Sequence, residues 1–175
     1  MKSVAENKKK QNISEYIIYM YQMEDLIRSY NFNLDEIELY VVSHYPVSVE
    51  QKKDISGWFG SLADQMKAEG IEEKGHLSEV QKEVDTLARI HWRLLKEDGE
   101  YFKIYDRTKP HLLDFIGSAE GVNLGHEIQI CINGMYGLLL CRLTGKKVSP
   151  ELRQAAEAFG EVLSYLNVVY KERET

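Results

Sequence analysis

His91 is the side chain in this sequence that is best suited to chemistry at neutral pH. A helical projection places it at the centre of an apolar stripe formed by Val80, Val84, Leu87, Leu94 and Leu95. An imidazole there points into the protein core. It either forms a structural hydrogen bond to a carbonyl or carboxylate group, or acts as an acid, a base or a metal ligand. The sequence leaves both interpretations open, and the structural one is the more common.

Two further charged residues lie at the edge of an apolar helical face. Glu24 falls between Ile17 and Met20 on a projection of residues 14–30, and Arg28 follows one turn later on the same side. A carboxylate in this position needs a partner, because desolvating an unpaired charge is costly. A Glu24–Arg28 ion pair is the structural interpretation, and ligand binding is the alternative.

Glu127 and His76 complete the set of candidate side chains. Glu127 opens an apolar segment, where the helix dipole favours a carboxylate even without a ligand. His76 ends a Glu-x-x-His sequence, a spacing found in di-iron bundles. Those sites need two such motifs on facing helices, whereas this chain has one on a glycine-containing turn. The candidate ligand-binding residues are therefore Glu24, Arg28, His76, His91 and Glu127.

Common catalytic and metal-binding motifs are missing from the sequence. It contains no His-Glu-x-x-His, Cys-x-x-Cys, glycine-rich phosphate loop or Gly-x-Ser-x-Gly. We therefore predict no metal ligands and no cofactor, and the sequence leaves open whether the protein is an enzyme.

The elements that must position these residues are helices. Apolar residues recur with a period of 3.6, strand-like alternation is rare, and there are only three prolines. Capping signals at Asn33, Ser48, Ser78 and Ser149 mark helix starts. We predict an all-α, single-domain bundle of about six or seven helices, over residues 14–30, 33–44, 48–70, 78–97, 101–116, 126–145 and 149–170. Pro110 should kink or break the fifth of these helices.

Residues 128–143, IQICINGMYGLLLCRL, are apolar on nearly every side, which is typical of a buried helix. This run is shorter than the roughly 20 apolar residues that a membrane span needs. We therefore predict that the bundle is built around this helix, with Asn133 buried. Gly134, Gly137 and Cys141 should form a small-residue groove at a close helix crossing.

Composition limits the partners and the cellular location. The 175 residues carry a formal net charge of −6, which argues against a nucleic-acid partner because such binding relies on clustered basic residues. The basic run Lys8–Lys10 belongs to a predicted flexible tail, residues 1–12, ahead of a domain over 13–172. Cys131 and Cys141 lie ten residues apart on one predicted helix, roughly 15 Å along its axis, too far for a disulfide. We expect a cytoplasmic protein that does not bind membranes.

Four segments carry a family resemblance: NISEYIIYMYQMEDLIRSY, EEKGHL, IHWRLLK and EIQICINGMYGLLLCRL. With them, the chain resembles a family of small all-helical bacterial proteins known only as a domain of unknown function. The likeness covers roughly residues 12–170. It implies an all-helical bacterial protein and assigns no activity, cofactor or catalytic residue.

Two functions fit these observations. The leading hypothesis is a non-catalytic cytosolic helical bundle that acts through protein–protein contacts, as a homodimer. Several apolar side chains off the main core stripes could form its interface; they are Ile18, Tyr19, Trp92, Tyr165 and Val168. The alternative is a small-ligand- or metal-binding enzyme with a polar pocket between the helices at residues 14–30, 78–97 and 128–143.

Overall fold

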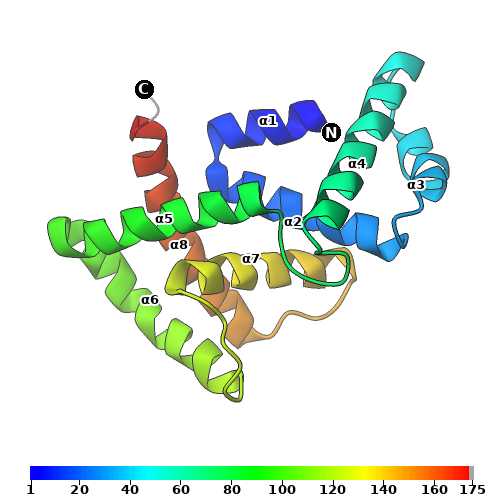
Figure 1. Cartoon of the computed structure of the whole chain (residues 1–175). Coiled ribbons are helices and arrows are strands. Elements are labelled where there is room, and N and C mark those ends of the chain that lie inside the picture. Colours follow the sequence, from blue (N-terminus) through cyan, green and yellow to red (C-terminus); the bar gives the residue numbers. More distant parts are fainter. Residues whose placement is uncertain (174–175) are drawn as a thin grey trace.

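Helices account for all the regular structure in the part of the chain that the computed structural model describes, residues 1–173 (Figure 1). They are α1 (Lys2–Gln11), α2 (Ile13–Ser29), α3 (Leu34–Tyr40), the 3-10 helix η1 (Val42–His44), α4 (Val49–Ala68), α5 (Ser78–Glu97), α6 (Gly99–Ser118), α7 (Glu127–Leu143) and α8 (Pro150–Arg173). The prediction of an all-α, single-domain protein is confirmed. The described residues form eight α-helices, and the one that the sequence analysis did not predict is α1.

The structure differs from the expected flexible tail in the first twelve residues. Residues 2–11 form α1, which packs on α2 and buries Ala5. Lys9 forms an ion pair with Glu83 of α5, with 3.0 Å between Nζ and Oε1. The basic segment is therefore a part of the fold that covers α2.

Polar side chains begin most of the helices as the sequence predicts. Asn33, Ser48 and Ser149 each accept a backbone N–H from the first turn of the following helix. Ser78 behaves differently, because its N–H and its hydroxyl both donate to the carboxylate of Glu69, each over 2.8 Å. These bonds tie the start of α5 to the end of α4.

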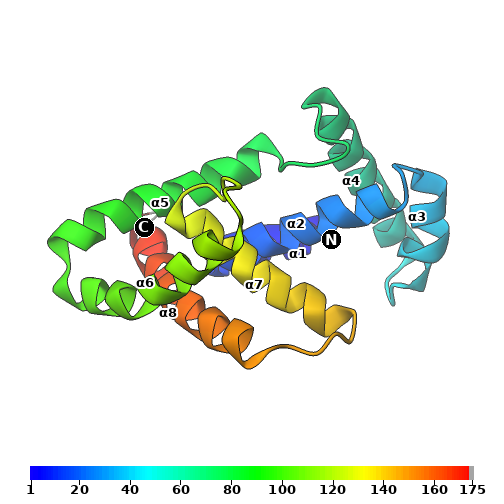
Figure 2. The same ribbon diagram turned by 90° about the horizontal axis from the view of Figure 1, so that it is seen from below.

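The helix in contact with most of the others is α2. It touches α1, α4, α5, α7 and α8 and buries ten of its own residues, including the charged Glu24. Figures 1 and 2 both show α3 and the outer part of α4 at one end of the molecule and α6 at the opposite end. Residues on α2, α5 and α7 can therefore meet in the middle of the molecule.

The predicted central helix, α7, is buried mainly along its first half. Ile128, Ile130 and Ile132 are almost inaccessible, whereas Leu143 near its C-terminal end is 59% exposed. Asn133 is exposed, so the prediction that it is buried was wrong. Among the described residues, no helix has the length and apolar content to cross a membrane.

The close helix crossing on α7 involves one glycine only. A Cβ atom at Gly134 would lie 2.7 Å from two ring carbons of Phe159 on α8. A Cβ atom at Gly137 would have no neighbour within 4 Å, and Cys141 is half-buried. The predicted small-residue groove is thus reduced to Gly134, where the Phe159 ring fills the space that a side chain would need.

Helix α6 runs without a break through Pro110. The hydroxyl of Thr108, in the turn before the proline, donates to the carbonyl oxygens of Ile104 on α6 and Ala158 on α8. The predicted break near this proline is therefore absent, because the helix continues to Ser118.

Candidate functional site

Buried His91 lies at the centre of a hydrogen-bonded group that we call the His91 cluster: His91 on α5, Tyr101 and Tyr105 on α6, and Glu127 at the start of α7. Because a carboxylate can only accept, Nε2–H of His91 donates to Glu127 over 2.8 Å. Nδ1 then accepts the hydroxyl of Tyr101 over 2.6 Å. The second oxygen of Glu127 accepts the hydroxyl of Tyr105 over 2.8 Å.

Every polar group of the His91 imidazole is satisfied inside the protein. The side chains of His91 and Tyr101 are inaccessible to solvent, and both ring nitrogens of His91 have partners. A ligand would have to displace one of these partners to reach the ring. The His91 cluster therefore joins α5, α6 and α7, and it supports the structural interpretation of this histidine.

The hydrogen bond from His91 is the main reason why the pKa of Glu127 lies below its usual value of 4.5. A carboxyl with a lowered pKa in the folded protein stabilises the fold above its unfolded pKa, and this contribution disappears as the pH falls through the folded pKa. We therefore expect Glu127→Gln to lose stability relative to the wild type near neutral pH, and the difference to shrink below about pH 4.5. Urea unfolding midpoints across this range measure it. Parallel pH profiles for the two proteins would contradict the expectation.

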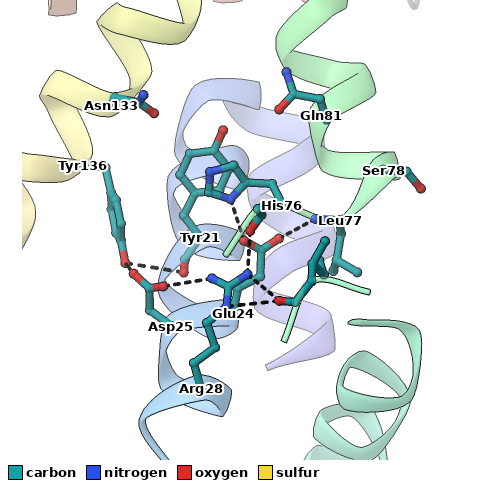
Figure 3. A network of polar contacts seen from close by, with 12 residues as sticks. Tyr21, Glu24, Asp25, Arg28, His76, Leu77, Ser78, Gln81, Asn133 and Tyr136 are labelled. Carbon is teal, nitrogen blue, oxygen red and sulfur yellow. Dashed lines mark hydrogen bonds and ion pairs between the residues drawn. The ribbon is translucent and has the colours of Figure 1, made fainter. Parts of the chain in front are cut away.

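A second group, which we call the His76 cluster, surrounds the buried carboxylate of Glu24 on α2 (Figure 3). It consists of Glu24, His76, Leu77 and Tyr21. One oxygen of Glu24 accepts the backbone N–H of Leu77 over 2.9 Å, and the other lies 2.7 Å from Nδ1 of His76. The carboxylate is inaccessible to solvent, whereas the His76 side chain is 29% exposed. The described residues provide no partner for Nε2 of His76, on the side of the ring away from Glu24.

The ring of His76 is fixed in orientation by a stacking contact. It stacks on the ring of Tyr21, with centroids 3.5 Å apart and planes 9° from parallel. The hydroxyl of Tyr21 accepts a hydrogen bond from Gln129 of α7 over 3.0 Å, and burial raises the pKa of Tyr21 to about 12. Gln81 of α5 also bonds to Gln129. The histidine therefore lies where α2, α5 and α7 meet.

Arg28 holds the loop that carries His76. Its guanidinium donates to the carbonyl oxygens of Ile71 and Gly75 and forms an ion pair with Asp25 over 3.0 Å. The predicted Glu24–Arg28 pair was therefore wrong, because each residue has a different partner. Gly75 supports the loop by adopting a φ of 104°, a conformation that suits glycine.

The five predicted site residues fall into two groups. His91 and Glu127 are bonded together, and so are Glu24 and His76, with Arg28 beside them. Within residues 1–173, no hydrogen bond or ion pair joins one group to the other. These contacts therefore do not support one shared site around all five residues, which stays an untested prediction.

Sequence reasoning missed several tyrosines of these groups. Tyr101 and Tyr105 are one helical turn apart on α6, and this spacing could have paired them with His91. Tyr21 precedes Glu24 by three residues, so both lie on one face of α2. In the described part of the chain, no group of three or more histidine, cysteine or acidic side chains is arranged to hold a metal ion.

The side chains predicted to form an interface do not form one exposed surface. Tyr19 is 9% exposed and its hydroxyl contacts the sulfur of Met1 over 3.4 Å, because α1 covers it. Trp92 and Val168 are exposed, at 48% and 59%, on α5 and α8 respectively. An interface must therefore be sought elsewhere on the molecule.

Comparison with known proteins gives a family and nothing closer. No curated protein and no solved structure matches the chain. A family model described as a domain of unknown function, DUF4924, matches residues 2–175, which includes both clusters and the eight α-helices of the described residues. The chain therefore belongs to the DUF4924 family of domains of unknown function.

Proposed function

We propose that the protein binds a small polar ligand beside His76, between α2, α5 and α7, and that Nε2 of His76 accepts a proton or hydrogen bond from it. The observation that carries this proposal is the asymmetry of the Glu24–His76 pair. A fully buried carboxylate holds Nδ1, while Nε2 of the partly exposed ring has no partner among the residues that the structure describes. The location corresponds to the predicted polar pocket between residues 14–30, 78–97 and 128–143.

The arrangement prepares the ring for proton transfer before a ligand arrives. Glu24 favours the tautomer with a proton on Nδ1, which leaves a lone pair on Nε2. The stacked ring of Tyr21 and the loop contacts of Arg28 hold the imidazole plane in place. A ligand with a hydroxyl or ammonium group would meet an acceptor that needs no reorganisation, as general bases require.

A ligand-capture experiment with His76→Gln tests this proposal. The low-molecular-mass fraction of an extract of the source organism is dialysed against each protein, and retained compounds are identified by mass spectrometry. We expect a compound that the wild type retains and that His76→Gln retains about tenfold less, which corresponds to the roughly 1.4 kcal/mol of one hydrogen bond. His44→Gln, at an exposed position on η1, should retain it fully. Equal retention by all three proteins would contradict the proposal.

Glu24→Gln separates the role of the ring from that of its orientation. The glutamine oxygen can still accept the Leu77 N–H, but its NH₂ group then faces His76 and requires Nδ1 to be the acceptor. We expect nitrogen NMR to show the His76 proton moving to Nε2, and ligand retention to fall as in His76→Gln. An Nε2–H tautomer in the wild type would overturn the assignment.

Free cysteines support the proposed cytoplasmic location. Cys131 is buried and Cys141 is half-buried, and neither forms a disulfide. Burial raises the pKa of the Cys131 thiol, which makes it an unreactive core side chain. Free thiols of this kind are typical of proteins from reducing compartments.

Action through protein contacts is a second candidate function, favoured by a different part of the molecule. Exposed apolar side chains gather on α3 and at the start of α4, far along the chain from His76. Such a surface is typical of an interface with another protein. It is compatible with ligand binding at His76, since the two surfaces share no residue.

A further inference from the structure

Helix α1 is joined to α2 through one extended residue. Asn12 separates the two helices with φ −155° and ψ 102°, and its side chain accepts the backbone N–H of Glu15. Ser14, just beyond it, donates its backbone N–H and its hydroxyl to the side-chain oxygen of Asn167 on α8. The start of α2 is therefore capped and anchored by residues outside α1, so α2 can stay in place when α1 moves away.

Little apolar packing holds α1 on the molecule. Figure 1 shows this helix at the outer edge, over α2, and Ala5 is the one buried residue among its ten. A helix of this length is marginally stable by itself in water. Helix α1 therefore depends on its contacts with α2 and α5, and it should unfold when those contacts are lost.

Lys9 forms an ion pair that is partly shielded from water. Its Nζ lies 3.0 Å from Glu83 of α5, whose side chain is 14% exposed, and 5.2 Å from the centroid of the Tyr16 ring. The carboxylate of Glu83 also accepts the hydroxyl of Tyr170 on α8 over 2.7 Å. A carboxylate with so little exposure attracts a cation more strongly than a fully exposed one, because less water screens the charges.

Lys8 and Met1 cover the ring of Tyr19. Nζ of Lys8 lies 6.0 Å from the centroid of this ring and 3.1 Å from the carboxylate of Glu15. The hydroxyl of Tyr19 contacts the sulfur of Met1. Tyr16 and Tyr19 are both buried and lie three residues apart, on one face of α2. Removal of α1 would therefore uncover two neighbouring tyrosine rings.

The same movement would remove one wall of an open groove between α1 and α4. The groove has a volume of about 1170 Å³, and its lining includes Val4 on α1 and Ile55, Trp58 and Leu62 on α4. Without α1, these side chains of α4 would be more accessible. Exposure of apolar surface is unfavourable, so the closed form is the resting state.

We propose that α1 is a displaceable strap, which opens as a unit about Asn12 and uncovers Tyr16 and Tyr19 while α2 to α8 keep their fold. The strap carries four lysines and one glutamate, and its ionic partners Glu15 and Glu83 are acidic. Attraction between opposite charges therefore helps to hold it closed. Salt screens such contacts, so higher ionic strength or the loss of a lysine charge shifts the strap towards its open form.

Two neighbouring lysines provide a matched test. Lys9→Glu places a like charge opposite Glu83, whereas Lys10 is exposed and forms no ion pair or ring contact within residues 1–173. Both lie in the last turn of α1, so the helix dipole disfavours the new glutamate in both variants. Hydrogen exchange with mass spectrometry compares Lys9→Glu and Lys10→Glu with the full-length wild type.

We expect the amides of α1 to exchange about fivefold faster in Lys9→Glu than in the wild type, and at the wild-type rate in Lys10→Glu. Raising sodium chloride to about 0.5 M should also speed exchange of α1 in the wild type. The amides of α2 should stay equally protected in all three proteins and at both salt concentrations.

Nitration of tyrosines by tetranitromethane gives a second readout. Tyr19 should be nitrated faster in Lys9→Glu, whereas Tyr40, which is 59% exposed on α3, should react equally in all variants. Exchange of α1 together with α2 would overturn the proposal, because α1 would then belong to the cooperative core. Exchange of α1 that ignores both salt and Lys9→Glu, or nitration of Tyr19 that stays at the wild-type rate, would overturn it as well. The outcome is independent of ligand retention at His76.

Discussion

Gly134→Ala should destabilise the protein, whereas Gly137→Ala should stabilise it. The new methyl group at position 134 would lie 2.7 Å from the ring of Phe159. That ring is fully buried and meets the ring of Phe115 edge-on at 5.3 Å, so it has no room to retreat. Overpacking of this kind costs about 1–3 kcal/mol, and the better helix propensity of alanine offsets part of it.

Gly137→Ala is the matched control, since it lies one turn further along the same helix with no neighbour within 4 Å of a Cβ atom. It should raise the free energy of unfolding by about 0.5–1 kcal/mol through helix propensity alone. Urea denaturation followed by circular dichroism measures both effects. A loss of similar size in the two variants would show that the helix crossing extends to Gly137.

His91→Leu should destabilise the protein by about 1–3 kcal/mol, because it leaves the buried hydroxyl of Tyr101 without a partner. Adding Tyr101→Phe removes that unsatisfied hydroxyl. We therefore expect the double variant to be more stable than His91→Leu alone, although it carries one more substitution.

Thermal and chemical unfolding of the wild type, both single variants and the double variant complete this double-mutant cycle. Glu127 should keep its hydrogen bond from Tyr105 in all four proteins. The cycle therefore isolates the interaction between His91 on α5 and Tyr101 on α6. Additive losses would indicate that the bond between His91 and Tyr101 contributes no coupling energy. Binding at His76 should be unchanged throughout.

Local patterns in the sequence were sufficient to predict most of the helices. Apolar spacing predicted α2 and α4 to α8, and the capping signal at Asn33 predicted α3. The side chains of Asn33, Ser48 and Ser149 mark three helix starts. Periodicity also placed His91 in the core, because a residue on the apolar stripe of a helix must point inward. These features depend on neighbours within a few residues.

The pairing of side chains across the fold was harder to predict. Glu24 and His76 are 52 residues apart, and no local pattern says which loop will reach a buried carboxylate. The choice between Gly134 and Gly137 depends on the position of Phe159 on another helix. The apolar stripe around His91 also suggests that an apolar residue would be tolerated at this position. The Tyr101 hydroxyl reverses that expectation.

The loop between α4 and α5 has an unusual dependence on α2. Two charged residues one turn apart on α2, Glu24 and Arg28, provide its bonds to Ile71, Gly75, His76 and Leu77. We therefore expect hydrogen exchange in this loop to proceed through one cooperative opening rather than residue by residue. A ligand that takes or gives a proton at His76 would alter one of these bonds, so occupancy could be transmitted to the flexibility of the whole loop. The Glu24 carboxylate would then determine both the reactivity of the His76 ring and the local unfolding of the loop between α4 and α5.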